Sequence, residues 1–314
     1  MALDQFPGDF DSKEVTPGAQ GFKGISFSHH GELMQGLFRR ADRTPVRALI
    51  TLPSPQHKTE ATFYPDRSAV IRAPQGRTKA ARAAEITLRT LRRADTGGRL
   101  EIESNIEIGA GLGSSASDVT ATILAVAKSA NIKLKNSEIA KIALAAESAY
   151  DPVVYGNRPL LWAQREAEIV EDFGDQLPAL AVLGFSLGSG VDTLAFKMPD
   201  YTPHEQEVFE LLRSTFRRAI KTGNLDLIGR VATRSAEINQ RYLEKPHFEE
   251  LKDIVSTCGA LGLQVSHTGS IVGMLFDPYE RFFLPKIQEA KRLLLTVNVG
   301  STWLFQTDMT NEVK

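Results

Sequence analysis

The sequence predicts a two-lobed α+β protein, and three observations support this prediction. The chain has 314 residues, which is more than one hydrophobic core usually serves. Its candidate strands and helices come in runs and do not alternate regularly, which is typical of an α+β fold. A glycine-rich segment, residues 109–117, joins a candidate strand to a candidate helix. We expect a loose tail over residues 1–20, an N-terminal lobe over 21–172 and a C-terminal α/β lobe over 173–314.

Periodicity predicts the elements of the first half. Alternating apolar residues indicate strands, and apolar residues three or four apart indicate helices. The expected strands are residues 23–37 (a strand or a loop that ends in a glycine turn), 47–52, 60–64, 69–73 and 99–108. The expected helices are residues 78–93, 116–130 and 137–150. Ile106 and Ile108 are expected to face the core. Ser137 is the expected N-cap of the third helix, which Asp151-Pro152 should stop.

The second half is predicted to be mostly helical. It begins with a strand pair, residues 180–185 and 191–196. The expected helices are residues 204–222, 225–243, 248–260 and 280–295, and the expected later strands are 270–276 and 301–306.

Composition limits the function classes. A formal net charge of −1 argues against a nucleic acid or an anionic membrane as the main partner. The single cysteine, Cys258, excludes an internal disulfide and suits a reducing cytoplasm. No apolar run of about 18 residues is present, so we expect no membrane span. The chain start does not resemble a signal peptide. A cytoplasmic enzyme or binding protein remains.

The glycine-rich segment predicts a nucleotide triphosphate site. Three glycines at alternate positions let the backbone fold closely around a ligand. The helix that follows directs its unpaired N–H groups and its positive end into the loop, which favours phosphate. The serine hydroxyls can bind phosphate or a magnesium ion. The residues expected to contact the nucleotide are Gly109, Gly111, Leu112, Gly113, Ser114, Ser115, Ala116 and Ser117.

Other motifs fit these glycines less well. A Walker loop needs a lysine before the hydroxyl residue, and no lysine stands beside Ser114 or Ser115. The dinucleotide fingerprint has a different glycine spacing. A plain strand-to-helix turn stays open, although it needs fewer glycines. Residues 184–188 fit the Gly-x-Ser-x-Gly elbow of serine hydrolases, but the residues after them alternate like a strand where the elbow needs a helix.

The segment 109–117 resembles motif 2 of the GHMP kinases, with Glu107 where that family usually has proline. Residues 31–36, Gly-Glu-Leu-Met-Gln-Gly, look like the N-terminal motif of the family, and residues 267–270 look like its C-terminal glycine loop. The three motifs occur in the family's order, over residues 21–310. The resemblance implies the family's two-lobed fold, ATP and Mg²⁺.

Within the family, the chain resembles most the L-threonine kinase branch of cobalamin biosynthesis. The features that carry this resemblance are residues 31–36, Asp118 and Val191-Asp192-Thr193. Two features depart from the branch. The loop Gly-Leu-Gly-Ser-Ser is closer to the general family, and Ser148 stands where the branch has a glutamate.

The resemblance also implies roles for single residues. Ser115 matches the second serine of motif 2, and Glu147 lies near the helix end that carries the family's magnesium glutamate, so both are expected metal ligands. Asp151 lies four residues further on, on the same face if the helix continues, and could orient the substrate hydroxyl. A solvated helix end is the alternative for both carboxylates. Glu32 is expected close to the phosphates or the substrate, with a turn role as its alternative.

The substrate residues are expected in the first and last motifs. They are His30, Gly31, Glu32, His267, Thr268, Gly269 and Ser270. Several family members have a lysine where this chain has Ser26, and His29 and His30 are candidates for the missing donor, with ordinary polar surface as the alternative.

The expected function is an ATP-dependent kinase that phosphorylates a hydroxyl group on a small molecule, with L-threonine first and L-serine second. Arg158 and the 267–270 loop are available to bind such an acceptor. The alternatives are a kinase for a different small alcohol and a binding or regulatory protein without catalysis. No nucleic-acid or membrane partner is expected, and a homodimer is compatible with this function.

Overall fold

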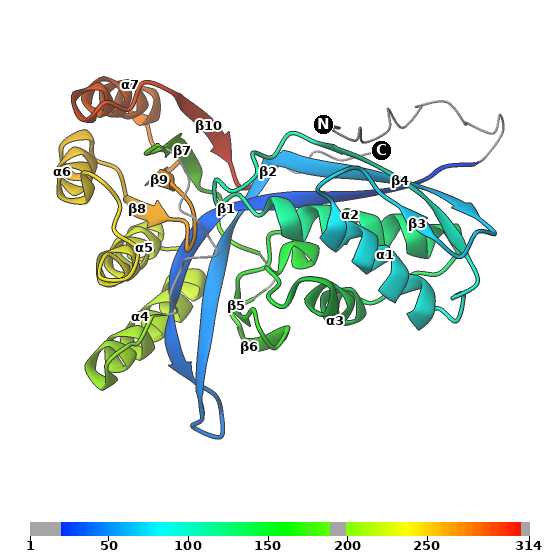
Figure 1. The fold of residues 1–314 in the computed structure, drawn as a ribbon. Helices are drawn as coiled ribbons and strands as arrows, with labels where there is room; N and C mark the ends of the chain where they lie inside the picture. The colour runs from blue at the N-terminus through cyan, green and yellow to red at the C-terminus, as the bar shows by residue number, and fades with distance from the viewer. Residues whose placement is uncertain (1–19, 175, 189–198, 309–314) are drawn as a thin grey trace, which may run out of the picture.

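The N-terminal half is a mostly antiparallel sheet with helices packed on one face (Figure 1). The computed structural model describes residues 20–174, 176–188 and 199–308. The strands of this half are β1 (Phe22–Arg39), β2 (Pro45–Asp66), β3 (Ile71–Arg72), β4 (Gly97–Ser104), β5 (Leu160–Ala163) and β6 (Glu168–Asp172). Its helices are α1 (Thr78–Thr90), α2 (Ser114–Ser129), α3 (Asn136–Glu147) and the short 3-10 helix η1 (Val153–Tyr155).

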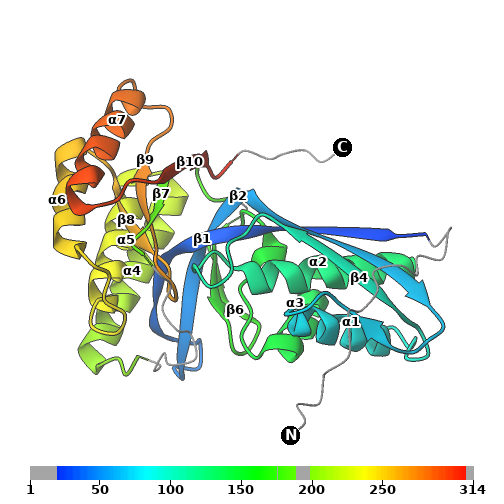
Figure 2. The same cartoon turned by 45° about the horizontal axis from the view of Figure 1, so that its top comes forward.

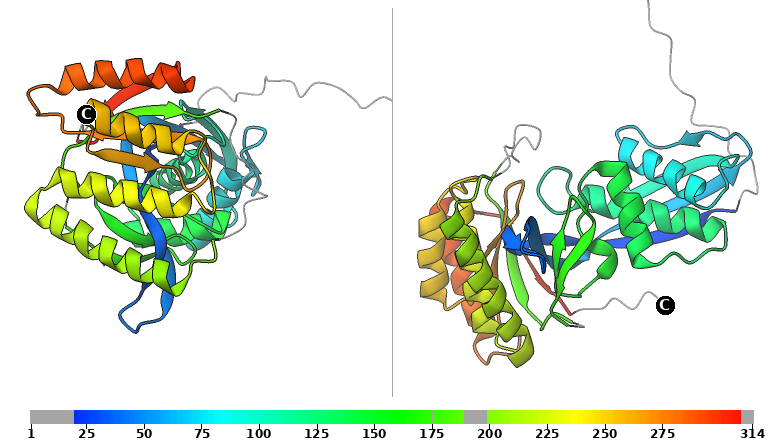
Figure 3. Two further views of the ribbon diagram at one scale, coloured as in Figure 1. Left: turned by 90° about the vertical axis from the view of Figure 1, so that its left-hand side faces the viewer. Right: turned by 90° about the horizontal axis from the view of Figure 1, so that it is seen from below.

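The C-terminal half is a second group of strands covered by a layer of helices, which the left panel of Figure 3 shows side by side. Its strands are β7 (Ala181–Ser186), β8 (Gly262–Val265), β9 (Ile271–Phe276) and β10 (Thr302–Gln306). Its helices are α4 (Pro203–Thr222), α5 (Leu225–Asn239), α6 (Phe248–Cys258), α7 (Phe283–Leu294) and the 3-10 helix η2 (Leu295–Val297).

One sheet connects the two halves. Its strand order is β10-β7-β9-β8-β1-β2-β4-β3, with β5 added to β2 and β6 added to β5. The long strands β1 and β2 run through both halves (Figure 2). β1 meets the C-terminal strands through one register pair, Glu32 opposite Val265 of β8. The sheet therefore carries Glu32 to the junction between the halves.

Apolar burial explains why the helices pack where they do. The middle of β1 supplies Leu33, Met34 and Phe38 to a core that Phe209 and Phe216 of α4 complete. A separate core lies between α6, α7 and the strands β7–β9. The sequence also explains the start of α4, where the side chains of Thr202 and Glu205 form a capping box.

Several predicted elements differ in detail. The strands expected at 47–52 and 60–64 are one strand, β2, which pairs with β1 from Pro45 to Phe63 with register shifts in between. The strands β5, β6 and β8 were not predicted, because they are only four or five residues long. Ile106 is 5% exposed as expected, whereas Ile108 is 70% exposed because it lies in the loop after β4. The strand expected at 191–196 lies outside the described residues.

The third helix also differs from its prediction. It begins at Asn136 and not after Ser137, and the carboxylate of Glu138 accepts a hydrogen bond from the N–H of Lys135. It ends at Glu147, where a left-handed Ser148 (φ +65°) breaks the helix before Asp151-Pro152 is reached. The helix therefore does not continue to Asp151, so the condition under which Glu147 and Asp151 would share a helical face is not met.

Candidate active site

The three alternating glycines of the loop are all left-handed, which explains their spacing. Gly109, Gly111 and Gly113 have φ values of +80°, +93° and +70°. A Cβ at Gly111 would lie 2.1 Å from the carbonyl oxygen of Thr268, and one at Gly113 would lie 2.5 Å from the ring of His29. A Cβ at Gly109 would have nothing within 4 Å. Two glycines thus allow close packing, while Gly109 borders open space.

The first turn of α2 points into this loop without a side-chain cap. Its N-cap is Gly113, which has no side chain to accept from the first N–H groups. A 16-residue helix with an uncapped start presents N–H donors and the positive end of its dipole to an anion. Ser117 is an exception among the predicted contacts. Its N–H donates to the Gly113 carbonyl and its hydroxyl to the Phe27 carbonyl. Both donors of Ser117 are therefore bonded within the protein, so neither is free to donate to a nucleotide, contrary to its predicted role.

Ser115 and Glu147 come together beside this turn, as predicted for a metal site. The Ser115 hydroxyl donates to Glu147 Oε2 over 2.5 Å, and Lys79 Nζ lies 3.5 Å from the same oxygen. The Glu147 side chain is 3% exposed, and its Oε1 has no partner within the described residues. Burial raises the pKa of Glu147 to about 7, against the opposing effects of Ser115 and Lys79.

This arrangement fits a magnesium ion. Mg²⁺ takes oxygen ligands and usually binds one or two protein groups, several waters and the phosphates of its nucleotide. An unpartnered, buried carboxylate oxygen beside a serine hydroxyl supplies such ligands. Across the described residues, no group of three or more His, Cys, Asp or Glu could hold a metal ion by itself. A magnesium ion here would therefore need a nucleotide to complete its coordination.

Asp151 lies near Glu147 and is held from two sides. Its Oδ2 is 3.0 Å from Nε2 of His29, and its Oδ1 accepts from the side chain of Gln164. Burial alone would raise the pKa of Asp151, but the charge and hydrogen bond of His29 hold it well below its usual range. For His29, burial opposes the charge, yet Asp151 and Glu32 raise its pKa. Asp151 and Glu32 therefore favour the protonated form of His29.

Glu32 joins the first motif to the last. Both its oxygens accept from His267, one from the backbone N–H over 2.5 Å and one from Nδ1 over 2.7 Å. Burial lowers the pKa of His267, but Glu32 outweighs this and raises it to about 9. Gly31 makes this geometry possible. It has φ +65°, and a Cβ there would lie 2.5 Å from Oε1 of Gln264.

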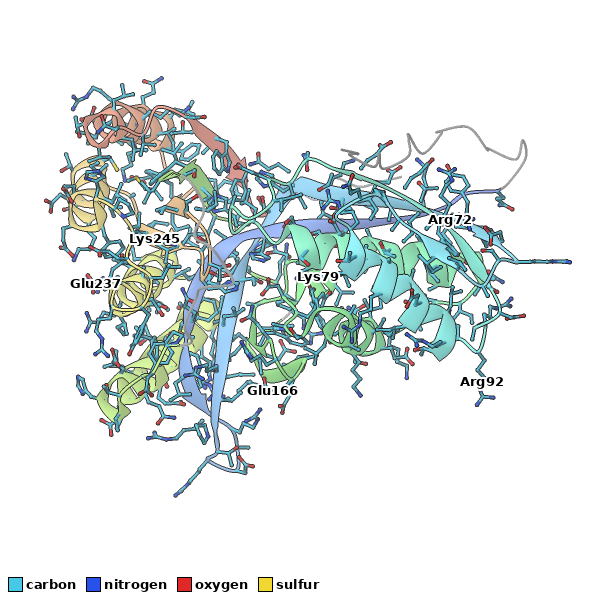
Figure 4. The ribbon with its side chains drawn as sticks, in the orientation of Figure 1. Arg72, Lys79, Arg92, Glu166, Glu237 and Lys245 are labelled. Atoms are coloured by element: carbon cyan, nitrogen blue, oxygen red, sulfur yellow. The ribbon has the colours of Figure 1, made fainter. Side chains whose placement is uncertain are left out.

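The two glycine-rich loops touch each other. The N–H of Ser270 donates to the carbonyl of Ala110 over 3.1 Å. Gly269 has φ +89°, and its absent Cβ would lie 2.2 Å from the same carbonyl oxygen. The Nζ of Lys245 donates to the carbonyl of Gly269 over 2.5 Å. In Figure 4, Lys245 lies in the C-terminal half and Lys79 in the N-terminal half, so the site draws on both.

His30 lies outside this cluster, contrary to its predicted substrate role. Its ring is fully buried against Trp303 and Phe305, with Nδ1 2.7 Å from the amide nitrogen of Gln264. Burial lowers the pKa of His30 to about 3, so it is neutral. Of the two histidines considered as the missing donor, only His29 faces Asp151.

Two further predicted residues have structural partners, and one predicted segment is not described. Asp118 is buried, accepts from Thr59 and pairs with Arg77 at the start of α1. Arg158, considered for acceptor binding, pairs with Asp172 on the surface. Residues 191–193 lie outside the described chain.

Sequence reasoning missed Gln164, Lys245 and Lys79. None of the three belongs to a motif, and each reaches the site only through the packing of elements distant in sequence. His29 was one of two alternatives, because a histidine pair beside Gly31 gives no signal of which ring faces inward.

Two family models match the chain. The model of the GHMP kinases N terminal domain matches residues 78–156, and that of the GHMP kinases C terminal matches residues 216–283. The chain is 27% identical to L-threonine kinase of Citrobacter freundii over 182 residues, which cover 57% of this chain and 62% of the relative. It is 28% identical to homoserine kinase of Caldicellulosiruptor bescii over 217 residues, covering 66% and 68%. It thus spans less than two thirds of the L-threonine kinase.

Solved structures share the fold at low identity. Homoserine kinase from Cytophaga hutchinsonii superposes with a TM-score of 0.69 at 16% identity, covering 94% of this chain and 96% of that one. Mevalonate kinase of Methanococcus jannaschii gives a TM-score of 0.59 at 17% identity, covering 93% and 98%. These likenesses show the two-domain α+β fold predicted from the sequence. Among the described residues, no helix is long and apolar enough to cross a membrane.

Proposed function

Because this chain belongs to the GHMP kinase superfamily, we propose that it transfers the γ-phosphate of ATP to the hydroxyl group of a small molecule. One observation carries the proposal: the buried carboxylate of Glu147 and the half-buried carboxylate of Asp151 lie near each other beside the uncapped start of α2. The helix start favours phosphate binding, the Glu147 carboxylate can bind a metal ion, and the Asp151 carboxylate can accept a hydrogen bond from the substrate hydroxyl.

The residues divide the work of phosphoryl transfer. Backbone N–H groups of residues 113–116 bind phosphate oxygens, and Ser115 and Glu147 hold Mg²⁺. That ion, when bound, neutralises charge on the phosphates. Phosphoryl transfer passes through a loose transition state, so catalysis depends mainly on positioning and charge neutralisation. The lowered pKa of Asp151 makes it a weak base, so its main role is to accept a hydrogen bond from the hydroxyl and direct the attack.

His29 gives Asp151 its fixed position. The family's frequent lysine is Ser26 here, whose hydroxyl donates to the Phe27 carbonyl. His29, whose protonated form Asp151 favours, lies beside the carboxylate in its place. This supports an active enzyme over a binding protein that has lost catalysis.

The relatives make a hydroxy amino acid the first acceptor to try. The matched relatives are named L-threonine kinase and homoserine kinase, and both names specify an amino acid with a side-chain hydroxyl. We propose L-threonine first and L-serine second, in the cytoplasm.

A coupled assay for ADP release tests the proposal. Purified protein with Mg²⁺ and ATP is offered L-threonine, L-serine, L-homoserine and uncharged small alcohols. We expect acceptor-dependent ADP release with at least one hydroxy amino acid. Binding of Mg·ATP without ADP release from any acceptor would favour the non-catalytic alternative and overturn the proposal.

A further inference from the structure

A small pocket of about 70 Å³ lies beside the Asp151 cluster. It is bounded by β1, β2, the residue after β5 and the loop after β8, and its lining includes Arg47, Gln164 and His267. The volume accommodates a few water-sized groups, so a small carboxylate fits but a nucleotide does not.

His267 brings a charged donor to this pocket. Its backbone N–H and Nδ1 are both used by Glu32, which fixes the ring. The raised pKa, about 9, keeps the imidazole protonated near neutral pH. Its side chain is 24% exposed, and Nε2–H has no hydrogen-bond partner among residues 20–174, 176–188 and 199–308. One cationic N–H is therefore free to bind a ligand.

Arg47 brings a second cation from β2. One terminal nitrogen of its guanidinium donates to the Pro199 carbonyl, which holds the side chain over the pocket. A guanidinium has five N–H donors and is a permanent cation. Two cationic donors around one small volume match the geometry and charge of a carboxylate.

Gln164 connects the pocket to the reacting centre. Its side-chain nitrogen donates to Asp151, so its side-chain oxygen is left as an acceptor. Only Gln164 would thus separate a carboxylate bound by Arg47 and His267 from Asp151, the residue proposed to direct the substrate hydroxyl. An ammonium group beside that carboxylate could donate to Gln164.

We propose that this pocket binds the carboxylate of the substrate that receives the phosphate. Arg47 and His267 are the cationic partners of that carboxylate, and the side-chain oxygen of Gln164 accepts a hydrogen bond from the substrate's ammonium group. The substrate class is then a short hydroxy amino acid. The inference rests on the proposed kinase function and adds the residues that select the substrate.

Acceptor specificity of Arg47→Gln tests the pocket. The acceptors compared are L-threonine and L-threoninol, which has a hydroxymethyl group in place of the carboxylate. We expect wild-type kcat/KM to favour L-threonine by at least about 100-fold, because an acceptor without a carboxylate leaves the two cationic donors of the pocket unpaired. In Arg47→Gln, the KM for L-threonine should rise at least about tenfold, with the KM for ATP within twofold of wild type. Arg43→Gln is the matched control. It removes the same charge from the nearby β1–β2 turn and should behave as wild type.

Two outcomes overturn the pocket and leave the kinase function intact: equal turnover of L-threoninol and L-threonine, or an unchanged KM for L-threonine in both Arg47→Gln and His267→Asn. If none of the tested acceptors supports ADP release by the wild-type protein, the kinase function fails. Calorimetry of L-threonine binding without ATP then decides the pocket separately. Binding to wild type that is lost in Arg47→Gln supports it, and no binding to wild type overturns it.

Discussion

At the scale of single residues, Glu147 illustrates how burial prepares a carboxylate for a ligand. Its side chain is almost fully buried, yet only one of its oxygens has a partner in the described chain. A buried polar atom without a partner costs stability, and a bound cation would remove that cost. The raised pKa of Glu147 has the same origin. Burial leaves the charged carboxylate poorly solvated, so the protonated form is favoured when no metal is bound.

Glu147→Gln should therefore weaken metal-dependent activity. The substitution keeps the size of the side chain and removes its charge. We expect turnover at saturating ATP to fall at least about tenfold, equivalent to about 1.4 kcal/mol of barrier, with a higher Mg²⁺ concentration needed for half-maximal rate. Because protons and Mg²⁺ compete for a group with a pKa of about 7, the Mg²⁺ requirement of wild type should rise as pH falls below 7. A magnesium titration at several pH values measures both effects.

Lys79→Gln is the control for this prediction. Lys79 is 54% exposed and lies 3.5 Å from the same carboxylate, so its loss changes the local charge without removing a metal ligand. Unchanged magnesium dependence in Glu147→Gln would rule out the assigned metal site.

Asp151→Asn should lower kcat much more than it changes the KM for ATP. The amide keeps the shape of the side chain but loses the negative charge that accepts a hydrogen bond from the substrate hydroxyl. It also loses the charge that pairs with His29. An interaction made mainly in the transition state affects kcat, so we expect a loss of about 100-fold or more. Steady-state kinetics with ATP and the acceptor varied in turn provide the measurement. A change confined to the KM for ATP would move Asp151 to the nucleotide site.

At the scale of elements, the contact between β1 and α2 sets the position of the glycine-rich loop, residues 109–117. A Cβ at Gly24 of β1 would lie 2.2 Å from the carbonyl oxygen of Ala121 and 2.5 Å from the nitrogen of Ala125, both backbone atoms of α2. The helix therefore lies against bare backbone of the strand. This close packing of α2 on β1 brings Gly113, at the start of α2, into contact with His29.

Gly24→Ala should destabilise the protein by about 2 kcal/mol or more, because a helix backbone cannot yield as a flexible side chain does. Urea unfolding followed by circular dichroism measures the free energy. Gly300→Ala is the matched control, since a Cβ at Gly300 would have nothing within 4 Å and should leave stability within about 0.5 kcal/mol of wild type. Equal stability of the two variants would contradict the close packing of β1 on α2.

At the scale of the whole molecule, an alternating row of charges joins the two halves. Asp151 faces His29, whose Nδ1 is 3.9 Å from Glu32, and Glu32 binds His267 of the C-terminal half. Opposite charges within this distance stabilise one another when they are poorly solvated. The row thus couples the relative position of the halves to the protonation of its histidines.

Stability should depend on pH through His267. Its pKa is about 9 in the folded protein and about 6.5 when unfolded, so the folded state binds its proton more tightly. The resulting stabilisation is fully present below pH 6.5 and is lost as pH rises through about 9. We expect His267→Asn to be less stable than wild type at pH 6 by about 3 kcal/mol at most. Unfolding curves for both proteins from pH 6 to 10 test this expectation.

The comparison between the two proteins cancels the titration of Glu147, which is common to both. Lys245 and His29 interact electrostatically with His267, so the difference also contains their response to its loss. A stability difference that stays constant, or grows with pH, would contradict the Glu32–His267 pairing.

The sequence by itself determined the fold class and the backbone conformation of the glycine-rich loop. Alternate glycines followed by serines need particular backbone conformations, and these are local properties of residues 109–117. The three motifs in their order likewise predicted the family, and the resemblance to that family proposed roles for Ser115, Glu147 and Asp151. Periodicity located most helices to within a few residues, because each exposes one face and buries the other.

Only the tertiary structure decided which side chains meet. His29 and His30 are adjacent in a strand, so they point to opposite sides, and the packing of Trp303 and Phe305 selects the one that is buried away from the site. Arg47, Gln164 and His267 are more than 200 residues apart at the extremes and carry no shared pattern. They converge because one sheet runs through both halves, and sequence periodicity carries no information about such long-range contacts.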